Sequence, residues 1–122
     1  MQHQGALAYQ QTTKTVETPR EREAALLMKS AAVLQRARDE APQGPSDELD
    51  GALLFNRKIW SIFLISATRD DNPLPVPVRQ NIANLGLFVM NETRELSQAP
   101  SASKLDALIN INRQIAAGLR GA

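Results

Sequence analysis

The sequence predicts an all-α fold, a small antiparallel bundle of about four helices preceded by a flexible N-terminal arm. Four segments carry apolar residues at steps of three and four, which is the spacing of one face of an α-helix. Clusters of proline and glycine separate these segments, and short connections favour antiparallel neighbours. No segment shows a competing strand pattern. We expect an arm at 1–17 and one domain at 18–120, with helices near 19–40, 47–68, 76–97 and 103–119.

The segment 47–68 holds the densest block of large apolar side chains, and the rest of the chain is organised around it. Two adjacent rows of residues give it an apolar arc wider than the stripe of an ordinary surface helix. This helix is therefore predicted to be central in the bundle or completed by a partner. The first row is Leu49, Leu53, Asn56, Trp60, Phe63 and Ala67, the second is Ala52, Phe55, Ile59 and Ile62, and the remaining polar strip is Asp50, Arg57, Lys58 and Ser61.

Helix starts are marked by local signals. Thr18, Pro19 and Glu21 form a capping box that opens the first helix. Ser46 or Asp47 caps the second helix, Pro75 or Pro77 lies in the opening turn of the third, and the run Ser103-Lys104-Leu105-Asp106 opens the fourth.

The other three helices each carry a buried stripe in this interpretation. Gly86, inside the third helix, indicates close packing against another helix. The predicted stripes are Ala24, Leu27, Ala31 and Leu34; then Val78, Ile82, Leu85 and Val89 with Phe88 alongside; then Leu108, Ile109, Asn112, Ile115 and Leu119.

Composition argues against catalysis. The chain has no cysteine and a single histidine, His3, so it lacks a thiolate site, a histidine cluster and the usual general base. Asp70 and Asp71 precede Asn-Pro and are interpreted as turn residues. We therefore expect no enzyme activity, no metal and no cofactor.

Location and partners are constrained by charge and hydropathy. The longest nearly apolar run, Ile59 to Ile65, is far shorter than the roughly 20 residues that span a bilayer. No signal-peptide core precedes it, so we expect a cytoplasmic protein without membrane insertion. The net charge is +1 and the basic residues are dispersed among acidic ones, which makes nucleic acid an unfavoured partner.

Several residues have both a core and a binding interpretation. Aromatic side chains at helical spacing usually pack inward, yet a partly exposed one becomes an anchor for a partner. Asn56 and Asn112 interrupt apolar rows, which indicates either an interhelical hydrogen bond or recognition of a partner backbone. The residues alone thus predict a non-enzymatic helical protein suited to helix-in-groove binding.

The order of motifs resembles the FlaF family, small flagellar biosynthesis proteins of alphaproteobacteria. The resemblance rests on Ala8-Tyr9, the run from Thr18 to Glu21, the run from Asn56 to Phe63, and Asn72 to Pro75 with Arg79 and Phe88. It continues in the C-terminal segment from Leu105 to Arg120, so that it covers nearly the whole chain. The chain departs from the family pattern at Val76-Pro77 and at Ser66.

The resemblance implies a cytoplasmic factor that promotes flagellin production and export as a flagellin secretion chaperone, working alongside FlbT. The export apparatus is a further expected partner. The alternative is an RNA-level regulator of flagellin translation, acting through FlbT or on flagellin mRNA with Arg57, Lys58 and Arg113. An adaptor that bridges FlbT or the export gate to flagellin is a third hypothesis. The partner-binding residues expected from the resemblance are Phe55, Asn56, Arg57, Trp60, Phe63, Arg79, Phe88, Asn112 and Arg113.

Overall fold

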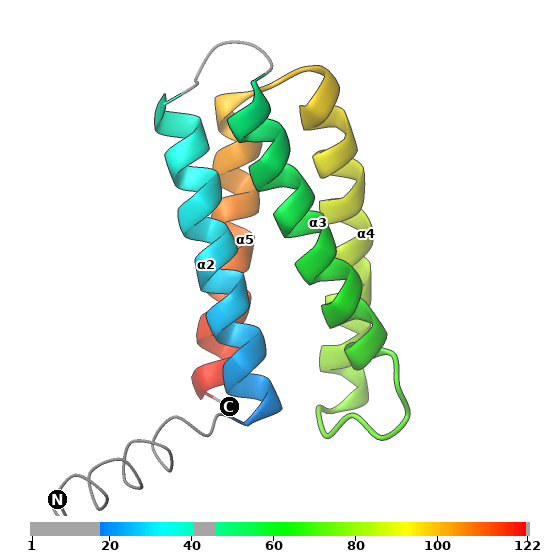
Figure 1. The fold of residues 1–122 in the computed structure, drawn as a ribbon. Helices are drawn as coiled ribbons and strands as arrows, with labels where there is room; N and C mark the ends of the chain where they lie inside the picture. The colour runs from blue at the N-terminus through cyan, green and yellow to red at the C-terminus, as the bar shows by residue number, and fades with distance from the viewer. Residues whose placement is uncertain (1–17, 41–45, 122) are drawn as a thin grey trace, which may run out of the picture.

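The computed structural model describes residues 18–40 and 46–121, and the arm expected at 1–17 lies outside the described residues. The described chain forms four helices that run alternately up and down (Figure 1). The all-α bundle predicted from periodicity is confirmed, and each helix ends within two residues of its expected boundary. The helices are α2 (Pro19–Glu40), α3 (Asp47–Ala67), α4 (Val76–Gln98) and α5 (Ala102–Gly121).

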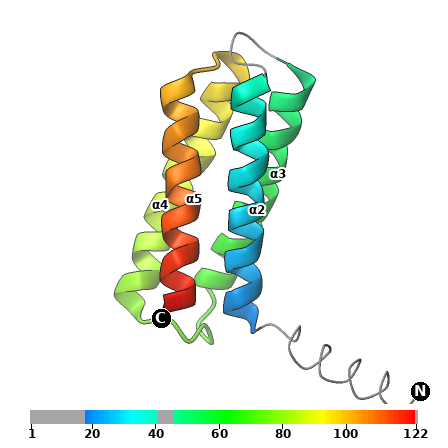
Figure 2. The same ribbon diagram turned by 90° about the vertical axis from the view of Figure 1, so that its left-hand side faces the viewer.

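Each helix packs against two others, so that α2, α3, α4 and α5 follow one another around the bundle. The most extensive contacts are between α2 and α5, which lie side by side in both views (Figures 1 and 2). Helices α3 and α4 form a second pair, and α4 touches α5 less than any other neighbours touch. The bundle is therefore best described as two helix pairs joined mainly through α2 and α3.

Helix starts are fixed by side chains that cap them. The first backbone N–H groups of a helix have no carbonyl acceptor within the helix, and a capping hydroxyl accepts from one of them. Thr18 Oγ1 accepts from Glu21 N at 3.1 Å, and Ser46 Oγ accepts from Leu49 N at 3.0 Å. The last helix begins at Ala102, one residue before the expected 103, and its capping residue is Ser101 instead of Ser103, since Ser101 Oγ accepts from Lys104 N at 3.4 Å. Side-chain caps thus set the starts of three of the four helices.

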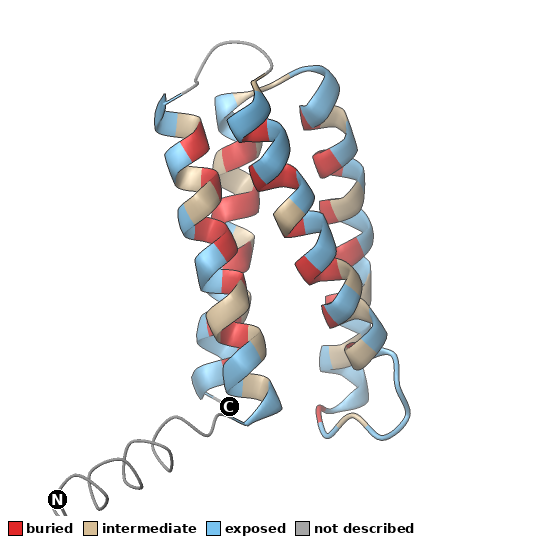
Figure 3. Cartoon of the chain, in the orientation of Figure 1, coloured by how far each residue is buried: buried red, intermediate tan, exposed pale blue. Residues whose placement is uncertain are grey.

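The core contains the whole first row predicted for α3, together with the stripe predicted for α2. Three other expectations of burial are wrong. Ile62 is 62% exposed, Val78 is 41% exposed and Phe88 is 45% exposed. Ile62 lies on α3 outside the part of the apolar arc that the neighbouring helices cover, and Val78 lies in the first turn of α4, which has few contacts with α5. Buried residues otherwise face inward between the helices (Figure 3).

Gly86 allows α3 and α4 to approach closely. A Cβ atom built there would lie 2.7 Å from Leu64 Cγ, too near for any real contact. The close packing predicted at this glycine is confirmed, and it fixes the spacing of the α3 and α4 pair.

Candidate functional site

Large apolar side chains remain exposed mainly on α3 and α4. Among the described residues, seven of the eight exposed large apolar side chains belong to these two helices. Soluble monomers rarely leave many such residues together without a use for them, so this helix pair is the first candidate for an interaction surface. The seven are Leu54, Ile62, Ile65, Val76, Val78, Leu87 and Phe88, and the eighth is Met28 on α2.

A groove of about 750 Å³ runs along the outside of α3 and α4. Leu53, Leu54 and Met90 supply its apolar lining. Arg57 from α3 and Arg94 from α4 bring two guanidinium groups to the same groove. The other lining residues are Asp50, Ser61, Asn91, Thr93 and Ser97. The groove therefore combines an apolar bed with positive charge.

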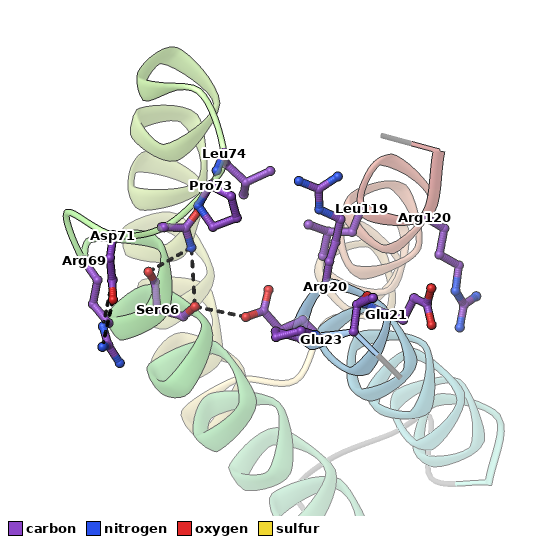
Figure 4. A pocket seen from close by; sticks show the side chains of 13 residues that line it. Arg20, Glu21, Glu23, Ser66, Arg69, Asp71, Pro73, Leu74, Leu119 and Arg120 are labelled. Atoms are coloured by element: carbon purple, nitrogen blue, oxygen red, sulfur yellow. Dashed lines mark hydrogen bonds and ion pairs between the residues drawn. The ribbon is translucent and has the colours of Figure 1, made fainter. Parts of the chain in front are cut away.

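A second cavity, of about 580 Å³, lies at the end of the bundle between the two helix pairs (Figure 4). Hydrogen bonds at its centre connect α2, the last turn of α3 and the loop that follows α3. Ser66 Oγ donates to Glu23 Oε1 at 3.0 Å, and Asn72 Nδ2 donates to the Ser66 carbonyl at 2.9 Å. Burial raises the pKa of Glu23 above its usual value, and the Ser66 hydroxyl and Arg20 act in the opposite direction. Arginines and carboxylates share the lining of this cavity with Pro19, Pro73, Leu74 and Leu119, so it is mixed in character and not purely polar.

Four of the expected partner-binding residues lie in the core. Trp60 Nε1 donates to Asn112 Oδ1 at 2.8 Å, and Asn112 Nδ2 donates to Asn56 Oδ1 at 2.7 Å. Ser30 Oγ donates to the same Asn56 oxygen at 2.8 Å, while Phe63 packs edge-on against Trp60 with ring centroids 5.3 Å apart. This buried network joins α2, α3 and α5. These side chains hold the bundle together, and a partner could touch them only if the helices separated.

The other five expected residues are accessible but do not form one cluster. Phe55 is partly buried with Lys29 Nζ 5.8 Å from its ring centroid, and Arg79 donates to the Arg69 carbonyl at 2.9 Å. Phe88 is 45% exposed and Arg113 is exposed on α5. Arg57 is the only one of the nine that lines the groove.

Sequence reasoning did not single out Leu54, Met90, Arg94 or Leu87 as site residues. They come from two helices that only the fold brings together. One feature of the sequence does bear on this surface, because the apolar arc of α3 is wider than the stripe of an ordinary surface helix. That observation predicted either a central helix or a helix completed by a partner, and the exposure of Ile62 leaves the second interpretation open.

The described residues offer no group of three or more His, Cys, Asp or Glu side chains that could hold a metal ion. A search of the same residues finds no helix with the length and apolar character needed to cross a membrane.

The fold and the exposed α3 and α4 surface define the class of the protein, a small antiparallel four-helix bundle with a grooved apolar face. Comparison with protein-family models then identifies the family. The model described as flagellar protein FlaF matches residues 6–119, and the chain belongs to the FlaF family of flagellar proteins. No match is found among curated proteins or among solved structures.

Proposed function

We propose that this FlaF-family chain binds flagellin in the cytoplasm as a secretion chaperone, without catalysing a reaction, and so promotes flagellin synthesis and export. The observation that carries the proposal is the concentration of exposed apolar side chains on α3 and α4 in a member of a flagellar family. FlbT and the export apparatus are further candidate partners in this proposal.

The physical need for such a chaperone follows from polymerisation. A subunit that assembles through amphipathic helices exposes apolar faces before assembly, and those faces must be covered until export. A grooved helical surface can cover an amphipathic helix with buried apolar contacts at i, i+3, i+4 and i+7. Binding of this kind depends mainly on apolar area and weakens with ionic strength far less than binding to nucleic acid does.

Calorimetric titration of the purified protein with monomeric flagellin from the same cell, at low and at high salt, tests the proposal. Micromolar or tighter binding at both salt concentrations is expected, with a negative heat-capacity change from burial of apolar surface. No detectable heat of binding at both salt concentrations would contradict it. The titration is repeated at a second temperature, because a binding enthalpy near zero at the first temperature would hide a real interaction. A flagellin mRNA leader titrated in parallel separates the RNA-level alternative, because phosphate contacts would weaken steeply with salt.

A further inference from the structure

We propose that the groove between α3 and α4 binds one amphipathic helix of flagellin. The apolar stripe of this helix is flanked by carboxylates. This inference rests on the proposed function and assigns its binding surface. Its evidence is the shape of the groove, its apolar bed and its charge.

The dimensions of the groove suit a helix. Its lining on α3 extends from Asp50 to Ser61, and at about 1.5 Å per residue this is roughly 16 Å, or three turns. Three turns accommodate four consecutive side chains of a helical stripe. The surface continues beyond the groove, since Ile65 on α3 and Leu87 on α4 are 65% and 70% exposed.

Apolar side chains continue along the groove at helical spacing. On α3, Leu54 lines the groove and Ile65 follows eleven residues later, which places both on one side of the helix. On α4, Met90 lines the groove and Leu87 lies three residues before it. The accessible apolar lining therefore comes mainly from Leu54 and Met90, since Leu53 is only 2% exposed.

The charge of the groove selects among possible occupants. Two arginines, Arg57 and Arg94, and one carboxylate, Asp50, line it, which leaves an excess of one positive charge. Among the described residues neither arginine is paired with a carboxylate, and Arg94 Nη2 instead donates to Asn91 Oδ1 at 2.6 Å. Carboxylates beside the apolar stripe of an incoming helix would supply the missing partners.

The same charges disfavour a second copy of this chain. A two-fold contact of this face with itself would bring the arginine pairs of both copies into one interface, where like charges oppose association. A nucleic acid fits less well, because two cations and a carboxylate over an apolar bed are a weak phosphate site. The observations thus favour an acidic-flanked amphipathic helix.

The test compares two charge-reversal variants with the same change in net charge. R57E/R94E alters the groove, whereas R22E/R36E alters two exposed cations on α2 that neither line the groove nor belong to the expected partner-binding residues. Binding of monomeric flagellin is measured by calorimetry for wild type and both variants, and circular dichroism verifies that each folds. R57E/R94E is expected to raise the Kd about tenfold or more at low salt, and R22E/R36E to change it less than about threefold.

Leu54→Asp serves as a second groove variant, since Leu54 is 50% exposed and its replacement leaves the core intact. It should also raise the Kd about tenfold or more, because it places a carboxylate in the apolar bed. If wild type binds flagellin and both groove variants bind equally well, the groove assignment is overturned and the chaperone proposal stands. If wild type does not bind flagellin, both are overturned.

Discussion

The two helix pairs differ in what they bury and what they leave exposed. Helices α2 and α5 pack most extensively and contribute a single exposed large apolar side chain among the described residues, Met28. An ion pair between Arg38 Nε and Asp106 Oδ1, at 2.6 Å, also joins them. Helices α3 and α4 contribute seven exposed apolar side chains and the groove. The α2 and α5 pair therefore supplies the more extensive packing, and the α3 and α4 pair carries the surface proposed to bind a partner.

The junction between the pairs is polar and buried. The network of Ser30, Asn56, Trp60 and Asn112 links α3 to both members of the α2 and α5 pair, and α4 has no part in it. Buried hydrogen bonds favour one arrangement of neighbouring helices, because other arrangements leave more polar groups without partners; in this network Asn56 Nδ2 is the buried atom that has no partner among the described residues. Helix α4 is held instead by its apolar packing and by Lys104 Nζ on Glu95 Oε2 at 2.9 Å.

Replacement of Trp60 should cause the largest loss of stability. Trp60→Ala removes a fully buried indole and leaves Asn112 without its donor, so we expect a loss of about 3–5 kcal/mol in the free energy of unfolding. Chemical denaturation measures it. Phe88→Ala, which removes a ring that is 45% exposed, is the control and should cost far less. A small loss for Trp60→Ala combined with lost flagellin binding would make Trp60 an interface residue instead.

Loss of the polar junction should have the next largest effect. Asn112→Ala removes an acceptor from Trp60 and a donor from Asn56 in a fully buried site, which should cost about 2–3 kcal/mol. The exposed Asn110→Ala on the same helix is the matched control, and it should be neutral or slightly stabilising because alanine has the higher helix propensity. Equal unfolding midpoints in urea for the two variants would show that the network contributes nothing to joining the helix pairs.

Close packing within the α3 and α4 pair gives a smaller effect. Gly86→Ala improves helix propensity by about 1 kcal/mol but forces Leu64 aside, and we expect a net loss of roughly 1 kcal/mol. Gly118→Ala is the control, because nothing lies within 4 Å of a Cβ at that position, and it should stabilise. In a double-mutant cycle, Leu64→Ala should remove the penalty of Gly86→Ala. A stabilising Gly86→Ala would contradict the tight contact.

The fold could be predicted from the sequence because its signals are local. Thr18 and Ser46 cap helices through backbone groups three residues away, and the row from Leu49 to Ala67 is set by helical spacing alone. Ser101 was missed because two serines two residues apart offer similar caps, and only the helix geometry chooses between them. Local chemistry thus specifies the elements and most of the core.

The proposed binding surface could not be predicted in the same way. Whether Ile62 or Val78 is buried depends on how far the neighbouring helices extend over it, which spacing along one helix does not encode. The groove joins Arg57 to Arg94 across two helices, so neither residue identifies it alone. Asn56 and Asn112 had two open interpretations from sequence, and their mutual hydrogen bond supports the structural one.

The smallest predicted effect concerns the cavity between the pairs. Burial raises the folded-state pKa of Glu23, so the folded protein holds a proton there more tightly than the unfolded chain does. Stability is therefore lost as pH rises from the ordinary value of 4.5 through the raised pKa of Glu23, and the loss persists at neutral pH. Glu23→Gln keeps an oxygen that can accept from Ser66 and removes the buried charge.

We accordingly expect Glu23→Gln to raise the melting temperature slightly at pH 7 and to leave it unchanged at pH 3, where Glu23 is protonated in both states. Glu21→Gln, at an exposed carboxylate in the first turn of α2, is the control. It should lower the melting temperature at pH 7, because a negative charge near a helix N-terminus is favourable. If Glu23→Gln also destabilised at pH 7, its hydrogen bond to Ser66 and its attraction to Arg20 would outweigh burial, and the cavity would hold the two pairs together through charge.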